Sequence, residues 1–413
     1  MPNLLSMNSY HYRRGGSDVV YFDHAALFEE KGWNNTFFSM HHPNNVDTPD
    51  SRHFVSLVDY EFAQTPVQKA RTALASIYNR EARAKARQLL AGRQFDIAHA
   101  HCIYHHLTPS VFDVFNEAGV PIVLTAHDLK LACPAYKMMN SNGICEECKG
   151  GNLLNTVRNR CIKGSLAASS VVAAEAMLHR FLKSYRRNVT KIVAPSRFYR
   201  TKLIEWGWEE DRVIYIPNFA KEVDSRFTAG HTGNILYFGR LSEEKGLATL
   251  IRASARSGVA VDIAGTGPER EDLETLIAQV QAPVRLLGRL DGDALWSAVG
   301  SAKAVVLPSE WYENAPMSAL EAMQLERPMI GADIGGIPEL IRDSGGGLVI
   351  PSADASALAD ALSQIEAMPQ ERLAQMGQSA ARYVRREFSR DRYFQRMDEL
   401  YRECLRAPGG RKA

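Results

Sequence analysis

The chain has 413 residues, more than a single hydrophobic core usually supports, so we expect two or three domains. A composition of 45% hydrophobic and 23% charged residues is typical of soluble globular proteins and excludes a disordered, fibrous or membrane-spanning chain. The net charge of +2 conceals a basic first half, in which residues 1–217 carry 26 Lys and Arg against 20 Asp and Glu.

Short aliphatic runs alternate with helical patterns along the whole chain, which predicts βαβ units and parallel sheets. The first series of strands is expected at residues 4–7, 36–39, 96–100, 122–125, 191–194 and 213–216, with helices such as 18–31 between them. The second is expected at 235–238, 261–264, 284–287, 304–307, 329–331 and 348–350, with helices that begin near Lys245, Glu269, Gly292 and Ala315. The alternation occurs twice, so we predict an α/β protein with two sheets.

The segment between the two series, residues 217–233, is poor in apolar residues and is predicted to join two domains. Aromatic and aliphatic residues at helical spacing in 390–406 predict a last helix that needs a surface to bury against. The spacing does not say which domain provides that surface.

Gly15-Gly16-Ser17 follows the first predicted strand and opens a helix with Asp18 in its first turn. Backbone N–H groups at such a helix start can bind an anion, and glycines remove the Cβ atoms that would block its approach. The same pattern is a common turn, so a phosphate contact and a plain turn are about equally favoured.

Two cations follow the first strand of the second series, in the run Gly239-Arg240-Leu241-Ser242-Glu243-Glu244-Lys245-Gly246. Open α/β sheets bind ligands at this edge, and Arg240 and Lys245 suit phosphate oxygens. A solvated loop, in which these cations pair with the two neighbouring glutamates, is the alternative. The next strand is followed by Ala264-Gly265-Thr266-Gly267, which lacks the third glycine of a dinucleotide fingerprint and disfavours a nicotinamide cofactor.

Residues 308–323 carry two carboxylates, Glu313 and Glu321. If Pro316 lies in the first turn of a helix, Glu313 precedes that helix and Glu321 lies within it. Both side chains would then line one ligand site, with Glu321 accepting hydrogen bonds from a vicinal diol and Glu313 nearer the reacting centre. An exposed acidic pair is the alternative.

Four cysteines, Cys133, Cys145, Cys148 and Cys161, form a C-x11-C-x2-C-x12-C pattern within residues 130–165. Two thiolates spaced as in C-x2-C can bind one tetrahedral zinc ion, so we expect a structural zinc in preference to free thiols or a redox pair. The remaining two cysteines, Cys102 and Cys404, are assigned no role.

Eight cations and no acid occur between Leu178 and Ile204, together with apolar residues such as Phe181 and Leu182. This segment suits an anionic membrane surface, although a solvated helix face explains it nearly as well. Nucleic acid is not expected, because no reader motif accompanies the charge. We recognise neither a transmembrane run nor a secretory signal, and therefore expect a cytoplasmic protein that contacts the inner face of the membrane at most peripherally.

The glycine pair, the 239–246 and 264–269 segments and the spacing of the two glutamates occur in the order seen in glycosyltransferase family 4, which the chain resembles over nearly its whole length. The resemblance implies a retaining enzyme with the GT-B fold, in which two Rossmann-like domains face each other across a cleft. It implies that residues 218–388 bind the nucleotide sugar, and that a last helix in 389–413 crosses back to complete the acceptor-side domain of residues 1–217.

The resemblance also implies two sets of site residues. The set expected at the reacting groups comprises Glu313, His127, Arg240 and Lys245, the two cations clamping the donor diphosphate. The set expected to bind the donor comprises Gly15, Gly16, Gly265, Asn314, Ala315, Pro316 and Glu321, the last as the ribose ligand. Trp311 and Tyr312 depart from the commoner family pattern beside Glu313, so the donor sugar stays open.

The function implied is sugar transfer from a UDP- or GDP-sugar to a glycan or lipid-linked acceptor in cell-envelope polysaccharide synthesis, with no cofactor required for catalysis. A nucleotide-sugar epimerase or hydrolase of the same fold and a catalytically silent glycan-binding protein are the alternatives. A requirement for an acceptor separates the transferase from the epimerase or hydrolase.

Overall fold

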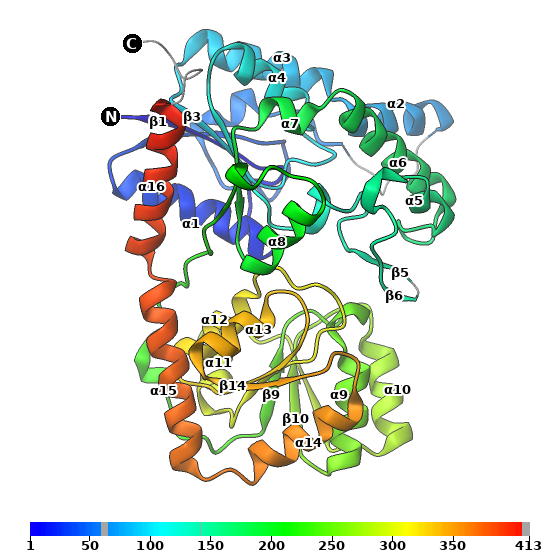
Figure 1. The fold of residues 1–413 in the computed structure, drawn as a ribbon, viewed down its shortest axis with the longest axis vertical. Coiled ribbons are helices and arrows are strands. Elements are labelled where there is room, and N and C mark those ends of the chain that lie inside the picture. Colours follow the sequence, from blue (N-terminus) through cyan, green and yellow to red (C-terminus); the bar gives the residue numbers. More distant parts are fainter. Residues whose placement is uncertain (59–64, 141, 407–413) are drawn as a thin grey trace.

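The computed structural model describes residues 1–58, 65–140 and 142–406. They form two halves, each built on a parallel six-stranded sheet with helices on both faces, stacked along the long axis of the molecule (Figure 1). The predicted α/β architecture with two sheets is confirmed.

The N-terminal sheet has the strand order β2-β1-β3-β4-β7-β8, and the ends of its strands differ from the predicted ones by at most two residues. The strands are β1 (Asn3–Met7), β2 (Asn34–Phe38), β3 (Ile97–Ala100), β4 (Ile122–Thr125), β7 (Lys191–Ala194) and β8 (Val213–Tyr215). The helices of this half are α1 (Gly16–Glu30), α2 (Pro66–Ile77), α3 (Arg80–Gly92), α4 (Ser110–Glu117), α5 (Asn155–Arg158), α6 (Leu166–Phe181), α7 (Ser184–Asn188) and α8 (Arg197–Glu205).

The C-terminal sheet has the order β11-β10-β9-β12-β13-β14, and all six strands were predicted. They are β9 (Ile235–Phe238), β10 (Val261–Ala264), β11 (Val284–Gly288), β12 (Val305–Leu307), β13 (Met329–Ala332) and β14 (Gly347–Ile350). The helices are α9 (Leu247–Ser257), α10 (Arg270–Val280), α11 (Gly292–Ser301), α12 (Met317–Gln324), α13 (Ile337–Ser344), α14 (Ala355–Glu366) and α15 (Gln370–Glu387). The order reverses between β9 and β12, the position at which doubly wound sheets bind ligands beyond their carboxyl ends.

The last helix, α16 (Arg390–Arg406), packs on the N-terminal half. Its buried residues Tyr393, Met397 and Tyr401 recur at helical spacing and join a core cluster with Phe28 and Trp33. In Figure 1 the helix, drawn in red, continues from α15 of the other half. The crossover expected from the resemblance is confirmed, and positions 407–413 of that expectation lie outside the described residues.

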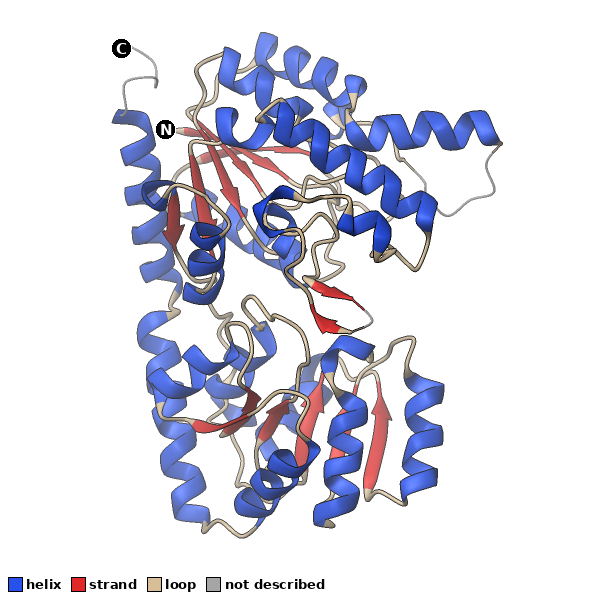
Figure 2. Cartoon of the chain, turned by 45° about the vertical axis from the view of Figure 1, so that its right-hand side comes forward, coloured by secondary structure: helices blue, strands red, loops and turns tan. Residues whose placement is uncertain are grey.

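The cysteine segment contains a two-stranded antiparallel hairpin, β5 (Met139–Asn140) and β6 (Gly143–Ile144), that was not predicted. Each of these strands has only two residues, which are too few for an alternation of apolar and polar residues to be recognised in the sequence. The hairpin extends toward the C-terminal half (Figure 2), and just beyond it Tyr312 Oη donates a 3.0 Å hydrogen bond to Glu146. Among the described residues, no helix has both the length and the apolar character needed to cross a bilayer.

Candidate functional site

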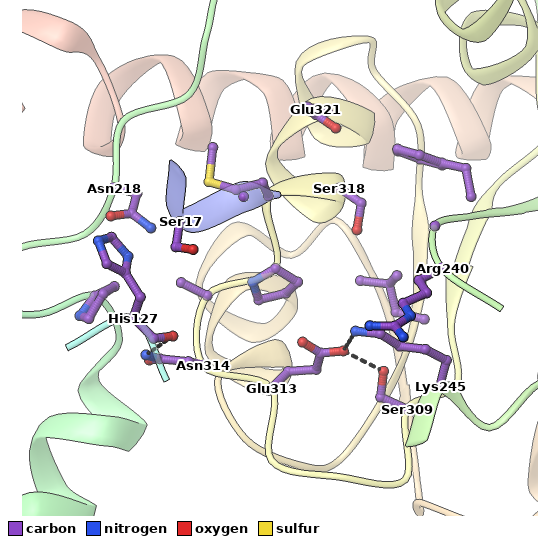
Figure 3. Close-up of a pocket in the computed structure, with 18 of the residues that line it drawn as sticks. Ser17, His127, Asn218, Arg240, Lys245, Ser309, Glu313, Asn314, Ser318 and Glu321 are labelled. Carbon is purple, nitrogen blue, oxygen red and sulfur yellow. Dashed lines mark hydrogen bonds and ion pairs between the residues drawn. The ribbon is translucent and has the colours of Figure 1, made fainter. Parts of the chain in front are cut away.

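A cavity of about 490 Å³ lies between the carboxyl ends of the two sheets and is lined by residues of both halves (Figure 3). Its volume is within the range of small-molecule sites. Of the predicted site residues, it brings together Gly16, His127, Arg240, Lys245, Glu313, Asn314, Ala315, Pro316 and Glu321. Gly15, Gly265 and the four clustered cysteines are not among its lining residues.

The cation pair follows β9, beside the reversal of strand order. Lys245 Nζ lies 2.6 Å from Glu313 Oε1 in a largely buried ion pair, and Ser309 Oγ donates a 2.9 Å hydrogen bond to the same oxygen. Lys245 therefore pairs with a carboxylate 68 residues away and not with its neighbouring glutamates, which contradicts the solvated-loop alternative for this residue. Arg240 lies beside it with an exposed side chain. The site thus presents two cations, one of them held in place by Glu313.

Gly265 allows two loops near the cavity to approach each other closely. It has a φ of +152°, and a Cβ atom there would lie 1.8 Å from the Gly239 carbonyl oxygen. Only glycine permits this approach of the β10 loop to the β9 loop. Its role in the structure is to hold the Arg240 segment in position.

Glu321 lies in α12 and lines the cavity, while Glu313 lies in the loop before that helix. This arrangement was predicted, although Pro316 is the N-cap of α12 and not a residue of its first turn. Burial raises the pKa of Glu321 to about 7, opposed only in part by Lys221. A carboxylate buried in this way is strongly stabilised by any hydrogen-bond donor that reaches it.

The N-terminal half presents the start of α1 to the cavity. Gly15 is the N-cap, Gly16 and Ser17 line the cavity, and a Cβ atom on Gly16 would lie 4.0 Å from Met317 Cγ of the other half. Asp18 in the first turn is buried and accepts a 2.9 Å hydrogen bond from Asn8. The positive end of the helix therefore lies at the cavity.

His127, just beyond β4, ends a buried row of histidines. His127 Nε2 and His101 Nδ1 share a 2.8 Å hydrogen bond, and the ring of His101 stacks on that of His99. His99 in turn hydrogen-bonds with Tyr401 of α16. Burial lowers the pKa of His127 to about 4, so its imidazole is neutral near pH 7.

Asn314 joins the two halves directly. Its Nδ2 donates hydrogen bonds of 2.8 and 3.1 Å to the carbonyl oxygens of Ala126 and His127, and its Oδ1 accepts one of 2.8 Å from Ser196 Oγ. All of these contacts cross from the β12 loop to the N-terminal half. Asn314 was predicted to bind the donor. Both polar atoms of its side chain form hydrogen bonds across the interface beside the cavity.

The four cysteines of the insert form no disulfide, and they lie close enough for the charges of their thiolates to interact. Burial raises the pKa of Cys161 to about 11, and Cys133, Cys148 and Cys145 add to the increase. No group of three or more potential ligands has a metal-binding arrangement in residues 1–58, 65–140 and 142–406. The zinc site stays a prediction.

Some lining residues were missed by sequence reasoning, among them Ser309, Asn218 and Cys102. Ser309 and Asn218 each follow a predicted strand within three residues, which is the signal that would have found them. Cys102, to which the sequence assigns no role, also follows a predicted strand within three residues and lines the cavity. An Asp-x-Asp pattern, Asp291 and Asp293, carries side chains that pair with arginines and do not line the cavity.

Comparison with known proteins links both halves to sugar transfer. Residues 14–221 match the family described as Glycosyltransferase Family 4, and residues 222–383 match Glycosyl transferases group 1. The alpha-D-kanosaminyltransferase of Streptomyces kanamyceticus is 32% identical over 189 residues, 44% of this chain and 48% of that protein. The phosphatidyl-myo-inositol mannosyltransferase of Mycobacterium leprae is 30% identical over 134 residues, 31% of this chain and 36% of that protein.

These alignments span less than half the length of the two curated relatives. Among solved structures, HepE of Anabaena in complex with UDP and glucose has a TM-score of 0.67 at 16% identity, over 98% of this chain and 100% of that chain. At this identity the likeness shows a common fold.

Proposed function

The chain belongs to glycosyltransferase family 4 and is a nucleotide-sugar-dependent transferase, and from this premise we propose how its donor is held and what accepts the sugar. The donor is a UDP- or GDP-sugar, and the acceptor is a glycan or lipid-linked intermediate of the cell envelope. The observation that carries the proposal is the cavity in which Arg240, Lys245 and Glu321 of one half face Gly16 and His127 of the other.

The donor diphosphate is proposed to lie between the cation pair and the start of α1. Arg240 offers a planar fork of N–H donors and Lys245 a point charge, while backbone N–H groups near Gly16 approach from the opposite half. Glu321 accepts hydrogen bonds from the ribose hydroxyls. Glu313 orients Lys245 through their 2.6 Å ion pair and leaves its second oxygen for hydroxyls of the donor sugar.

Retention of anomeric configuration requires the acceptor oxygen to attack from the face that the diphosphate leaves. The bond from that oxygen to the anomeric carbon forms as the bond from the carbon to the diphosphate oxygen breaks, and the acceptor proton passes to a departing phosphate oxygen. Negative charge grows on the diphosphate, where Arg240 and Lys245 are already in place. His127, whose imidazole is neutral near pH 7, supplies a hydrogen bond without a charge.

The proposal is tested by replacing Lys245 with Ala, with Lys303→Ala as the matched control. Lys303 pairs with Glu366 away from the cavity. Loss of one preorganised donor typically costs ~2.7–4 kcal/mol in the transition state, so kcat/KM should fall about 10²- to 10³-fold in Lys245→Ala and stay unchanged in the control. Turnover of Lys245→Ala at the wild-type rate would refute the clamp.

The acceptor class is supported by the mannosyltransferase relative, whose name specifies phosphatidyl-myo-inositol, a lipid.

A thermal-shift panel of UDP-, GDP- and ADP-sugars identifies the donor first, because a ligand at 100 times its Kd adds about 2.7 kcal/mol to the free energy of unfolding. The matched donor is then incubated with and without lipid-linked and soluble glycan acceptors. Consumption of the donor at the same rate without any acceptor would favour a hydrolase or epimerase.

A further inference from the structure

The outer part of the N-terminal half carries a surface formed by α2, α5 and α6, here called the α2–α6 face. In Figures 1 and 2 these helices project to the side of the molecule, away from α16. Both α2 and α5 contact α6. His179 Nε2 donates a 2.8 Å hydrogen bond to the Ile77 carbonyl oxygen and thereby joins the ends of α6 and α2.

The outward side of α6 is apolar. Only one exposed residue of this helix is charged; the exposed residues are Leu166, Ala167, Ser170, Ala174, Met177, Leu178, Arg180 and Phe181. Phe181 is 84% exposed. A helix on the surface of a soluble protein ordinarily turns its charged residues to water, so this face is the reverse of the usual pattern.

The neighbouring helices extend the apolar surface. On α2, Val67 is 78% exposed and Leu74 is 69% exposed, with the exposed Ala70 between them. Leu154, directly before α5, is 62% exposed. Large apolar side chains therefore reach solvent from all three elements of the face, and such clustering marks an interaction site.

The charges on this surface are mostly positive; the exposed Glu147, whose carboxylate accepts a hydrogen bond from Asn159 at the end of α5, is an exception. Residues 149–188 contain eight Lys and Arg, of which Lys149, Arg186 and Arg187 form ion pairs with acids outside this range. The single acid within it, Glu175, is buried in a 2.7 Å ion pair with Lys130. On α2, Lys69 and Arg71 occur without an acid. Arg180 and Lys183, beside Phe181, are exposed and have no ion-pair partner in the part of the chain that the structure describes.

We propose that the α2–α6 face docks on an anionic lipid surface. Exposed aliphatic and aromatic side chains enter the boundary between headgroups and acyl chains, while Lys and Arg meet the lipid phosphates. The excess of exposed cations over exposed acids on this face favours an anionic partner over a protein surface of mixed charge. This inference is independent of the donor reaction, since none of these residues lines the cavity.

The experiment is flotation of the full chain with vesicles of phosphatidylcholine alone or with 30% phosphatidylglycerol. We expect binding only to the anionic vesicles, weakened by salt. Phe181→Ser combined with Val67→Ser should reduce partition at least tenfold, and Lys183→Gln about fivefold. The matched control is Leu287→Ser, an exposed leucine of β11 in the other half, which should bind like wild type.

Failure of the wild-type chain to bind anionic vesicles, or equal binding by the double variant and the control, would overturn the proposal. Sedimentation of the same variants tests the competing occupant. A dimer of the wild-type chain that Phe181→Ser abolishes, together with no flotation, would assign the face to a second copy. Since these side chains are exposed, equal thermal unfolding of all variants verifies that only the surface has changed.

Discussion

Replacement of Glu321 by Gln should stabilise the free protein at alkaline pH while it weakens nucleotide binding. Burial raises the pKa of this carboxyl from 4.5 to about 7. At about 1.4 kcal/mol for each pH unit, this rise corresponds to about 3 kcal/mol of folding free energy that is lost once the native carboxylate ionises. The neutral amide, of the same shape, does not carry this penalty.

The sign of the pH dependence follows from proton binding. Between pH 4.5 and about 7 the native carboxyl keeps its proton while the unfolded one has lost it, so the contribution of Glu321 to stability falls as pH rises through this window. This contribution is fully present below pH 4.5, and it no longer changes with pH above the native pKa of about 7. The stability gained by Glu321→Gln should therefore grow from near zero at pH 4.5 to its maximum at pH 8.

Thermal unfolding at pH 5 and pH 8 measures the stabilisation of the free protein. At pH 8 the melting temperature of Glu321→Gln should exceed that of the wild type by up to about 6–12 °C for a domain of this size. Calorimetric titration with a nucleotide sugar measures the second. Loss of the anionic acceptor for the ribose hydroxyls, about 1.5–3 kcal/mol, should weaken binding roughly 10- to 150-fold. Glu371→Gln, on the exposed side of α15, is the control and should change stability by no more than about 0.5 kcal/mol.

The reasoning is refuted if Glu321→Gln is less stable than wild type at pH 8, since the carboxylate would then be stabilised and not strained by its surroundings. Unchanged affinity for the nucleotide sugar in a folded Glu321→Gln variant would refute the ribose assignment alone. The two outcomes are separable, because one concerns the free protein and the other its complex.

Three further changes probe the interface, the histidine row and the insert. Asn314→Ala removes three of the hydrogen bonds that join the halves and leaves those of Tyr312 with Glu146 and of Arg197 with Glu339, so the radius of gyration from X-ray scattering should increase slightly, and an unchanged value would contradict the interface role. His101→Gln removes the imidazole that orients His127 and should lower kcat with little effect on the melting temperature; a wild-type kcat would show that the pair is structural. Elemental analysis should find one zinc per chain and a loss of metal in Cys148→Ser, whereas thiols that react without releasing metal would exclude the site.

Local composition was sufficient to predict the two six-stranded sheets. β4 is a run of four apolar or β-branched residues, Ile122–Thr125, buried on both faces, and its predicted ends were correct. Parallel strands covered by helices on both sides carry such runs, so each strand is legible without its neighbours. Some residues that follow strand ends, such as Arg240 and His127, were also identified, because the carboxyl edge of a doubly wound sheet is where ligands bind, whereas Ser309 and Asn218 were missed.

Tertiary structure alone decided which of these residues meet. The partner of Lys245 is Glu313, the side chain of Asn314 is committed to the other half, and Cys102 reaches the cavity. The spacing of residues 390–406 determined a helix, and its docking on the N-terminal sheet was decided by the fold. Periodicity reports which face of an element is apolar, whereas contacts between distant elements depend on strand order and on how the two halves close, and neither is encoded in local spacing.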